Sequence, residues 1–300
     1  MGIRLFIETD LFADVDDVGA LAVGLSLQRL GECRIVGIGV NTPSKWGPLA
    51  ARAVLDHHAV DIPVGRHHRT TEDVAEPDYA RTIGRTVRTQ PAPLASDLLK
   101  DILRQPGEPL TVVSIGFFPN LLRIAREEPD LVRRRVRRCV VMGGVFPGGW
   151  EFNVSTYAAE TAEFLEAWPT PIDFVGFETA SDVITGVDLA ATLDVDDPVR
   201  IAYESFCGAG TGRPSWDPLT VYVAVHPDWP AFGWSDPGEF TMDGTLGQWR
   251  STPTGRHRHL IRTAPPEEVQ RQLDPLLGDP TRPLPIPATT PSPARGCPDC

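Results

Sequence analysis

The chain has 300 residues, 41% of them hydrophobic and 23% charged, which is typical of a globular protein with a large core. Its formal net charge of −12 disfavours nucleic acid as a partner, because an acidic surface repels a phosphate backbone. No apolar run reaches the roughly 18 residues of a membrane span, and no apolar signal-peptide core follows the start. We therefore expect a soluble, cytoplasmic protein that does not contact membranes.

Strand-like apolar runs alternate with helical patterns along most of the chain. The expected strands are residues 3–9, 33–41, 61–66, 109–117, 138–144 and 171–178. The expected helices are residues 18–30, 47–59, 94–105, 119–134 with a break near Pro129, 158–168 and 217–227. This alternation predicts an α/β fold with a mostly parallel central sheet and helices on both faces.

The pattern weakens toward the C-terminus. Residues 239–252 and 256–264 could form a hairpin with each other. The last part of the chain is dense in proline and cannot build a core. We therefore predict one domain over residues 1–274, followed by a disordered tail over residues 275–300.

Five carboxylates follow the first predicted strand, at the point where it gives way to a helix: Glu8, Asp10, Asp14, Asp16 and Asp17. They repel one another unless something compensates. A helix start favours one or two of them. A run of acids separated by apolar residues suggests inward-pointing ligands for a hard cation such as Ca²⁺. The residues alone thus favour a cation site, with a solvated acidic loop as the alternative.

This acidic turn resembles that of the inosine-uridine-preferring nucleoside hydrolase family, whose pattern is D-x-D-P-G-x-D-D. Four later segments agree with the family in the same order: VGIGVN, VSIGFFPNL, VVMGGVFPGGWEFNV and SWDPLTVYVAV. Together the five segments span residues 5–227. The resemblance implies the Rossmann-like nucleoside hydrolase fold.

The resemblance also implies a calcium ion at the bottom of a sugar-binding pocket. Asp10, Asp17 and Asp217 would be its carboxylate ligands, and Ile115 would offer its backbone carbonyl. The ion would bind the 2′- and 3′-hydroxyls of a ribose. Taken alone, Asp217 could equally be the residue that caps a helix.

The turn departs from the family pattern, because it is two residues longer and lacks the Pro-Gly. We align Asp16 and Asp17 with the terminal acid pair of the family. Asp16 then takes the position that contacts the 2′-hydroxyl and activates water. Asp14 is an extra acid that could displace one of the metal ligands.

Several residues would form the sugar pocket by resemblance. Asn41, Glu151 and Asn153 fill positions that hydrogen-bond the sugar, while Met142 and Phe152 would line it. Four of them have a structural alternative: Asn41 as a turn residue, Asn153 as a loop residue, Glu151 as a helix cap and Met142 as ordinary core.

Trp216 stands where purine- and inosine-cleaving members carry the histidine that protonates the leaving base. Indole cannot donate a catalytic proton at neutral pH, but it can stack on an aromatic group. None of the seven histidines of the chain is assigned this role. The group that activates the leaving base therefore stays open.

The resemblance implies a calcium-dependent N-ribohydrolase that splits a ribonucleoside or related ribosyl compound into base and ribose. Two alternatives follow from the missing histidine: an enzyme of specialised metabolism that acts on another ribosylated metabolite, and a non-catalytic ribose or nucleoside binder. The family also implies a homo-oligomer, either a dimer or a tetramer.

Overall fold

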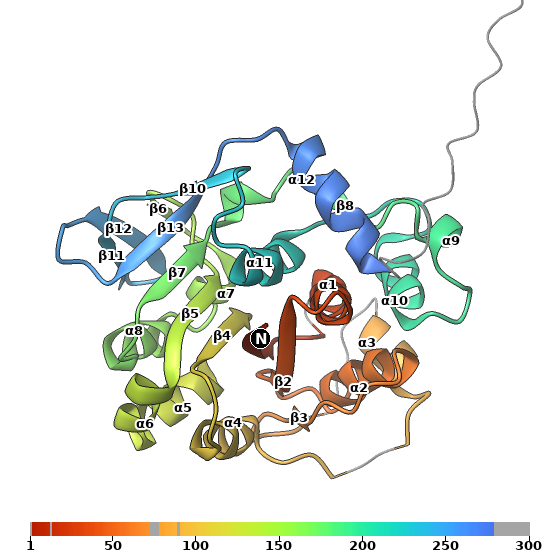
Figure 1. The fold of residues 1–300 in the computed structure, drawn as a ribbon, viewed down its shortest axis with the longest axis horizontal. Helices are drawn as coiled ribbons and strands as arrows, with labels where there is room; N and C mark the ends of the chain where they lie inside the picture. The colour runs from red at the N-terminus through yellow and green to blue at the C-terminus, as the bar shows by residue number, and fades with distance from the viewer. Residues whose placement is uncertain (1, 13, 72–77, 89–90, 279–300) are drawn as a thin grey trace, which may run out of the picture.

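A mostly parallel sheet runs through the middle of the molecule (Figure 1). The computed structural model describes residues 2–12, 14–71, 78–88 and 91–278. Across the sheet the strands are β3 (Val64–Gly65), β2 (Cys33–Val40), β1 (Ile3–Thr9), β4 (Leu110–Ile115), β5 (Val136–Met142), β7 (Ile172–Val175), β13 (His257–Arg262), β11 (Gly238–Asp243), β12 (Leu246–Ser251) and β6 (Gly148–Gly149). Strand β10 (Phe232–Trp234) pairs with β13, while β8 (Ile184–Thr185) and β9 (Arg213–Pro214) form a separate pair.

Helices cover both faces of this sheet, so the predicted α/β class is confirmed. They are α1 (Asp16–Arg29), α2 (Gly47–His57), α3 (Tyr79–Gly84), α4 (Ala95–Arg104), α5 (Pro119–Glu127), α6 (Pro129–Arg135), α7 (Phe152–Ser155), α8 (Ala158–Ala167), α9 (Leu189–Thr192), α10 (Pro198–Cys207), α11 (Trp216–Val225) and α12 (Pro266–Leu273), with 3₁₀ turns η1 (Phe177–Thr179) and η2 (Asp274–Leu277). None of the helices in the described part of the chain is long and apolar enough to cross a membrane.

Strand β1 shows why the sheet is buried on both faces. Its side chains alternate, and Leu5 and Ile7 belong to the core under α1, α2 and α11, whereas Phe6 belongs to the core under α4, α5 and α8 (Figure 1). All three residues are fully buried. A continuous apolar run is what such a doubly covered parallel strand requires.

The strand order reverses between β1 and β4. The chain passes from β1 to β2 and β3 on one side, and β4 then pairs with the opposite side of β1. Thr9 and Ile115, the last residues of β1 and β4, lie side by side in the register. Ligands of such sheets bind at the carboxyl ends of the strands where the order reverses. The fold therefore predicts a ligand site at the loops that follow β1 and β4.

The hairpin expected between residues 239–252 and 256–264 forms only in part, because β11 pairs antiparallel with β13 at one position, Gly238 with His257. A tighter hairpin lies within the first segment, where β11 and β12 pair through a turn at Gly244, whose φ is 61°. On its other side β13 runs parallel to β7 and extends the main sheet. Arg258 of β13 lies opposite Asp173 of β7, and an ion pair joins the two side chains.

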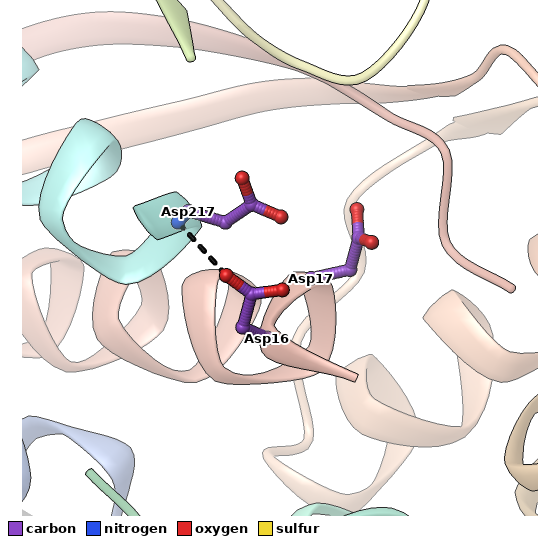
Figure 2. Close-up of side chains that lie close together, drawn as sticks. All are labelled: Asp16, Asp17 and Asp217. Atoms are coloured by element: carbon purple, nitrogen blue, oxygen red, sulfur yellow. Dashed lines mark hydrogen bonds between the residues drawn. The ribbon is translucent and has the colours of Figure 1, made fainter. Parts of the chain in front are cut away.

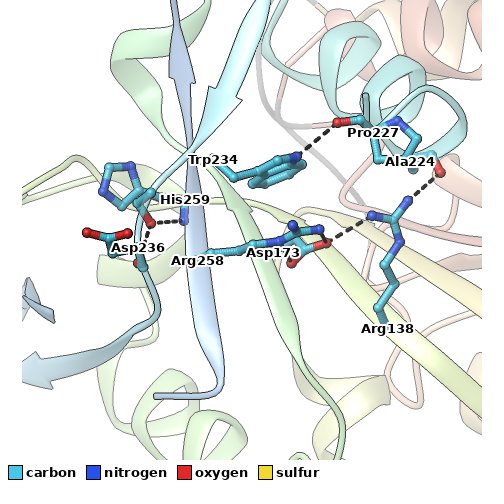
Figure 3. A network of polar contacts seen from close by, with 9 residues as sticks. Arg138, Asp173, Ala224, Pro227, Trp234, Asp236, Arg258 and His259 are labelled. Atoms are coloured by element: carbon cyan, nitrogen blue, oxygen red, sulfur yellow. Dashed lines mark hydrogen bonds and ion pairs between the residues drawn. The ribbon is translucent and has the colours of Figure 1, made fainter. Parts of the chain in front are cut away.

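Asp173 is the centre of a buried polar network that ties three strands to a helix (Figure 3). Its carboxylate accepts from Arg138 Nη1 of β5 at 2.9 Å and from Arg258 Nε of β13 at 2.7 Å. Arg138 also donates to the carbonyl of Ala224 in α11 at 2.8 Å. The bond to the Ala224 carbonyl holds α11 against the sheet, and it thereby helps to position the first turn of α11, which carries Asp217.

The core of the domain extends beyond residue 274, the predicted end of the domain. Leu276 and Leu277 are buried in the core beside α1, and Ser26 Oγ of α1 donates to the Leu276 carbonyl at 2.8 Å. The rest of the predicted tail, residues 279–300, lies outside the described residues.

Candidate active site

A cavity of about 450 Å³ opens at the carboxyl ends of the strands, beside the point where the strand order reverses. The residues that line it are Asp10, Asp14, Asp16, Ile115, Met142, Trp150, Glu151, Phe152, Asn153, Phe177, Phe206, Arg213, Trp216 and Asp217. A larger hollow of about 840 Å³ lies at the opposite ends of the strands, around Arg4 and Arg34. We assign the site to the smaller cavity, because the buried acids lie there.

Three carboxylates lie close together (Figure 2), and two of them, Asp16 and Asp217, line the cavity, whereas Asp17 is buried beneath them. One oxygen from each of Asp16, Asp17 and Asp217 lies within 4.8 Å of the other two. Asp16 and Asp17 form the first turn of α1, and Asp217 lies in the first turn of α11. The positive ends of two helix dipoles therefore face the carboxylates.

Backbone and side-chain donors orient these acids. The Asp217 N–H donates to Asp16 Oδ2 at 3.1 Å (Figure 2). The hydroxyl of Thr9, at the end of β1, donates to Asp17 Oδ1. Asp17 Oδ2 is buried without a hydrogen-bond partner among the described residues.

Asp10 joins the same group of acids from the end of β1. Contact with the Asp17 carboxyl partly offsets the effect of burial on the pKa of Asp10. A Cβ atom built on Gly116 would lie 2.6 Å from the Asp10 Cβ and 2.7 Å from its backbone nitrogen. Only glycine therefore allows the chain after Ile115 to pass this close to Asp10, and Ile115 itself lines the cavity.

The electrostatics of the group are those of an anionic site that lacks a compensating charge. Burial raises the pKa of Asp10 to about 7, and burial together with mutual repulsion raises the pKa values of Asp16, Asp17 and Asp217 well above their usual range. Among the described residues that line the cavity, Arg213 is the only cationic side chain. A bound divalent cation would relieve this repulsion and satisfy the open oxygen of Asp17.

Asp14 lies outside the tight group, on the cavity wall. Its Oδ1 accepts from Arg213 Nε at 2.9 Å, and its Oδ2 accepts from Arg213 Nη2. Oδ1 also accepts from the Val15 N–H at 2.7 Å. The extra acid of the turn thus binds a guanidinium in this structure, rather than lying beside the three clustered carboxylates.

The residues expected around the sugar divide into two groups. Met142, Glu151, Phe152 and Asn153 line the cavity. Glu151 caps α7, because its carboxylate accepts the backbone N–H groups of Asn153 at 2.9 Å, Val154 at 3.3 Å and Gly144 at 2.9 Å. Its structural alternative as a helix cap is therefore realised at the cavity edge.

Asn41 is placed differently from the expectation. It follows β2 and is buried, but it does not line the cavity. Neither atom of its side-chain amide has a hydrogen-bond partner within the described ranges. Asn41 lies beside Glu8, which accepts from Asn120 Nδ2 at 2.9 Å and whose pKa burial raises to about 8. The buried carboxyl of Glu8 and the buried amide of Asn41 therefore lie next to each other, outside the cavity lining.

Aromatic rings form the upper wall of the cavity. Trp216 stacks on Phe177, with ring centroids 5.1 Å apart at an angle of 27°, and its Nε1–H donates to the Phe177 carbonyl at 2.8 Å. Trp150, Phe152 and Phe177 are each more than 40% exposed. Exposed aromatic rings around a cavity mouth favour a flat ligand.

Three residues that line the cavity were not among the predicted site residues. Phe177 lies at the end of the strand expected at 171–178, whereas Phe206 and Arg213 come from the region between that strand and the helix expected at 217–227, where no element was predicted. Arg213 lies in a two-residue strand that has no periodicity, and the helix α10 that carries Phe206 was missed. An arginine and aromatic residues that precede the Trp-Asp pair were the only available signal.

The family model described as inosine-uridine preferring nucleoside hydrolase matches residues 5–267. The pyrimidine-specific ribonucleoside hydrolase RihA of Salmonella paratyphi B is 25% identical over 170 residues, which are 51% of this chain and 51% of RihA. The non-specific ribonucleoside hydrolase RihC of Klebsiella pneumoniae is 25% identical over 207 residues, covering 63% of this chain and 67% of RihC.

A solved structure has the same overall fold as this chain. The inosine-uridine preferring nucleoside hydrolase from Bacillus anthracis superposes with a TM-score of 0.70 at 17% identity, covering 92% of this chain and 99% of the other. This likeness concerns the fold alone. The chain spans about half the length of the curated RihA relatives that it matches. The family match nevertheless covers most of the described sequence, and the chain belongs to the inosine-uridine preferring nucleoside hydrolase family.

Proposed function

We propose that this protein is a calcium-dependent N-ribohydrolase that cleaves the N-glycosidic bond of a ribonucleoside to base and ribose. The observation that carries this proposal is the convergence of Asp10, Asp16, Asp17 and Asp217 at the floor of a cavity with an aromatic upper wall. The acids suit a cation and a sugar, and the rings suit a planar base.

The residues present fit a calcium ion. Asp10, Asp17 and Asp217 would hold it with their carboxylates, and Ile115 with its backbone carbonyl. Asp17 Oδ2 has no other partner in the described chain, which is unusual for a buried carboxylate. When bound, the ion would orient the vicinal hydroxyls of the ribose and lower the pKa of nearby water.

Asp16 is the proposed general base. Its Oδ2 accepts the Asp217 N–H, which fixes the carboxylate at the cavity floor, and Asp16 lines the cavity. It takes a proton from the water that attacks C1′ as the glycosidic bond breaks. The cluster of negative charge also stabilises the positive charge that develops on the ribose ring.

The sugar is gripped from the side of α7. Asn153 Nδ2 donates to the Met142 carbonyl at 3.3 Å, and the Asn153 N–H is held by Glu151. Glu151 thereby fixes Asn153 at the cavity edge, and both side chains face the cavity. We propose that these two residues hydrogen-bond the sugar, while Phe152 and Met142 contact its apolar surface.

The test is release of reducing sugar from a panel of ribonucleosides in the presence of Ca²⁺, with and without a chelator. We expect turnover that the chelator abolishes and that Asp16→Asn lowers by about 10²–10⁴-fold. Asp182→Asn is the matched control, since Asp182 pairs with Arg262 on the surface, away from the cavity. Turnover that survives both the chelator and Asp16→Asn would contradict the proposal.

A second candidate function has one observation in its favour. No histidine lies among the described residues that line the cavity, and the resemblance places Trp216 at the position of the leaving-group acid. The chain could therefore act on a different ribosylated metabolite, or bind ribose without turnover. Ribose binding without release of sugar from any riboside would favour the binder. Size-exclusion chromatography tests the dimer or tetramer that the family resemblance implies.

A further inference from the structure

The proposed hydrolase leaves one chemical task without a residue, and we propose that Arg213 performs it. Arg213 stabilises the base as it departs in the form of an anion, and Asp14 positions the guanidinium for this role. This inference rests on the proposed N-ribohydrolase activity and extends it to the leaving group.

The geometry around Arg213 supports this role. Nε and Nη2 are engaged by the two oxygens of Asp14. The remaining amino group, Nη1, has no hydrogen-bond partner within the described ranges. The guanidinium carbon lies 5.4 Å from the Phe206 ring centroid and 5.6 Å from that of Trp216. All of these residues line the cavity, so the guanidinium faces the same space as the aromatic wall.

The two departures from the family pattern that the resemblance indicates both lie next to Arg213. Asp14 is the extra acid of the turn after β1, and Trp216 replaces the histidine expected to protonate the base. Asp14 and Arg213 are 199 residues apart in sequence, yet their side chains form a two-point ion pair. Such a pair fixes the orientation of a guanidinium better than a single contact does. The extra acid thus has a function that does not require it to bind the metal.

The reaction balances without a protein proton donor. The bond between C1′ and the base nitrogen breaks, and its electron pair stays on the base. The oxygen of water forms a bond to C1′, and the proton of that water passes to Asp16. The base leaves as an anion next to the guanidinium and takes a proton from solvent after it has left. Arginine stays protonated throughout, so it acts as a fixed positive charge rather than as an acid.

This role predicts how rates depend on the leaving group. An enzyme without a leaving-group acid should cleave ribosides in order of the acidity of the departing group, whether it is a purine, a pyrimidine or a phenol. For the wild-type protein we expect kcat/KM to rise from uridine to 5-fluorouridine and further to 4-nitrophenyl β-D-ribofuranoside. A flat series would show that the leaving group is protonated by another residue, and would overturn the inference.

Variants of Arg213 and Asp14 distinguish an effect of the positive charge on the leaving group from a general effect on the fold. Arg213→Gln should lower kcat/KM for uridine by about 10²–10³-fold, the cost of removing one preorganised donor, and for the 4-nitrophenyl riboside by less than about 10-fold. Arg213→Lys should recover part of the loss, because it keeps the charge but not the fork. Asp14→Asn should show the same dependence on the leaving group in a weaker form. Arg200→Gln is the control, since Arg200 forms an ion pair with Glu204 on α10.

The outcomes are distinct. If the wild-type protein releases ribose from none of the ribosides, the proposed function fails and this inference fails with it. If the wild-type protein is active but Arg213→Gln loses the same factor on every leaving group, or loses nothing, only the role of Arg213 is overturned. Circular dichroism and thermal unfolding show whether each variant folds. If Arg213→Gln does not fold, the wild-type series and Arg213→Lys decide the question.

Discussion

Gly116 offers a sharp test of how the fold builds the acidic floor of the cavity. In Gly116→Ala the new Cβ would lie 2.6 Å from the Asp10 Cβ and 2.7 Å from its backbone nitrogen. Ordinary contact begins at 3.4 Å, so the ends of β1 and β4 must separate by about 0.8 Å. Both neighbouring atoms belong to rigid parts of the chain and cannot rotate away. Overpacking of this kind costs about 1–3 kcal/mol of unfolding free energy.

The same displacement should reduce activity more than stability. Asp10 would move relative to Asp17, and a shift of about 1 Å in a catalytic group can cost about 10²-fold in rate. Urea denaturation measures the loss of stability, and ribose release measures the loss of activity. Gly233→Ala is the matched control, because a Cβ there meets no atom within 4 Å. A Gly116→Ala protein as stable and as active as Gly233→Ala would refute the reasoning.

Two further predictions concern buried polar groups away from the cavity. Asp173→Ala should lower the unfolding free energy by about 3 kcal/mol, the lower end for a broken buried ion pair. The reason is that Arg138 would stay buried without its carboxylate partner, while Arg258 can reach solvent. Urea denaturation checks this, and a loss below about 1 kcal/mol would argue against a structural role for the network. Burial lowers the pKa of His257 to about 4, and its Nδ1 accepts the Phe240 N–H at 2.9 Å, so the folded state keeps it neutral while the unfolded chain binds a proton below pH 6.5. The contribution of His257 to stability is therefore present above pH 6.5 and is lost as the pH falls toward 4. Relative to His257→Gln, the wild-type protein should lose about 2 kcal/mol of unfolding free energy between pH 8 and pH 5. A difference in unfolding free energy between the two proteins that stays constant with pH would contradict this.

Much of the architecture could be predicted because it depends on local patterns. The alternation of apolar runs and helical segments gave the parallel sheet, and the break at Pro129 separates α5 from α6 as expected. The pairing of β13 with β7 could not be predicted, because it depends on a contact between Arg258 and Asp173 that are 85 residues apart. Arg213 lies in the two-residue strand β9, which has no periodicity, and the sequence did not indicate it for that reason.

The acids of the site could be found in the sequence because five of them crowd one turn. The arrangement of their side chains could not be predicted, because it depends on how the first turns of α1 and α11 lie relative to each other. The structure places Asp16 in the tight group with Asp17 and Asp217, and it pairs Asp14 with an arginine that the sequence did not suggest. Asn41 was expected in the pocket by resemblance, yet packing behind the turn places it beside Glu8.

The most direct test of the central claim is the calcium dependence of unfolding for the wild-type protein and Asp17→Asn, after prior removal of metal with a chelator. Repulsion among the buried acids should make metal-free wild-type protein less stable than metal-free Asp17→Asn. Calcium at 100 times its Kd should then stabilise the wild-type protein by about 2.7 kcal/mol and Asp17→Asn far less. Unfolding midpoints that do not respond to Ca²⁺, with the wild-type protein no less stable than Asp17→Asn, would contradict a cation site among these carboxylates.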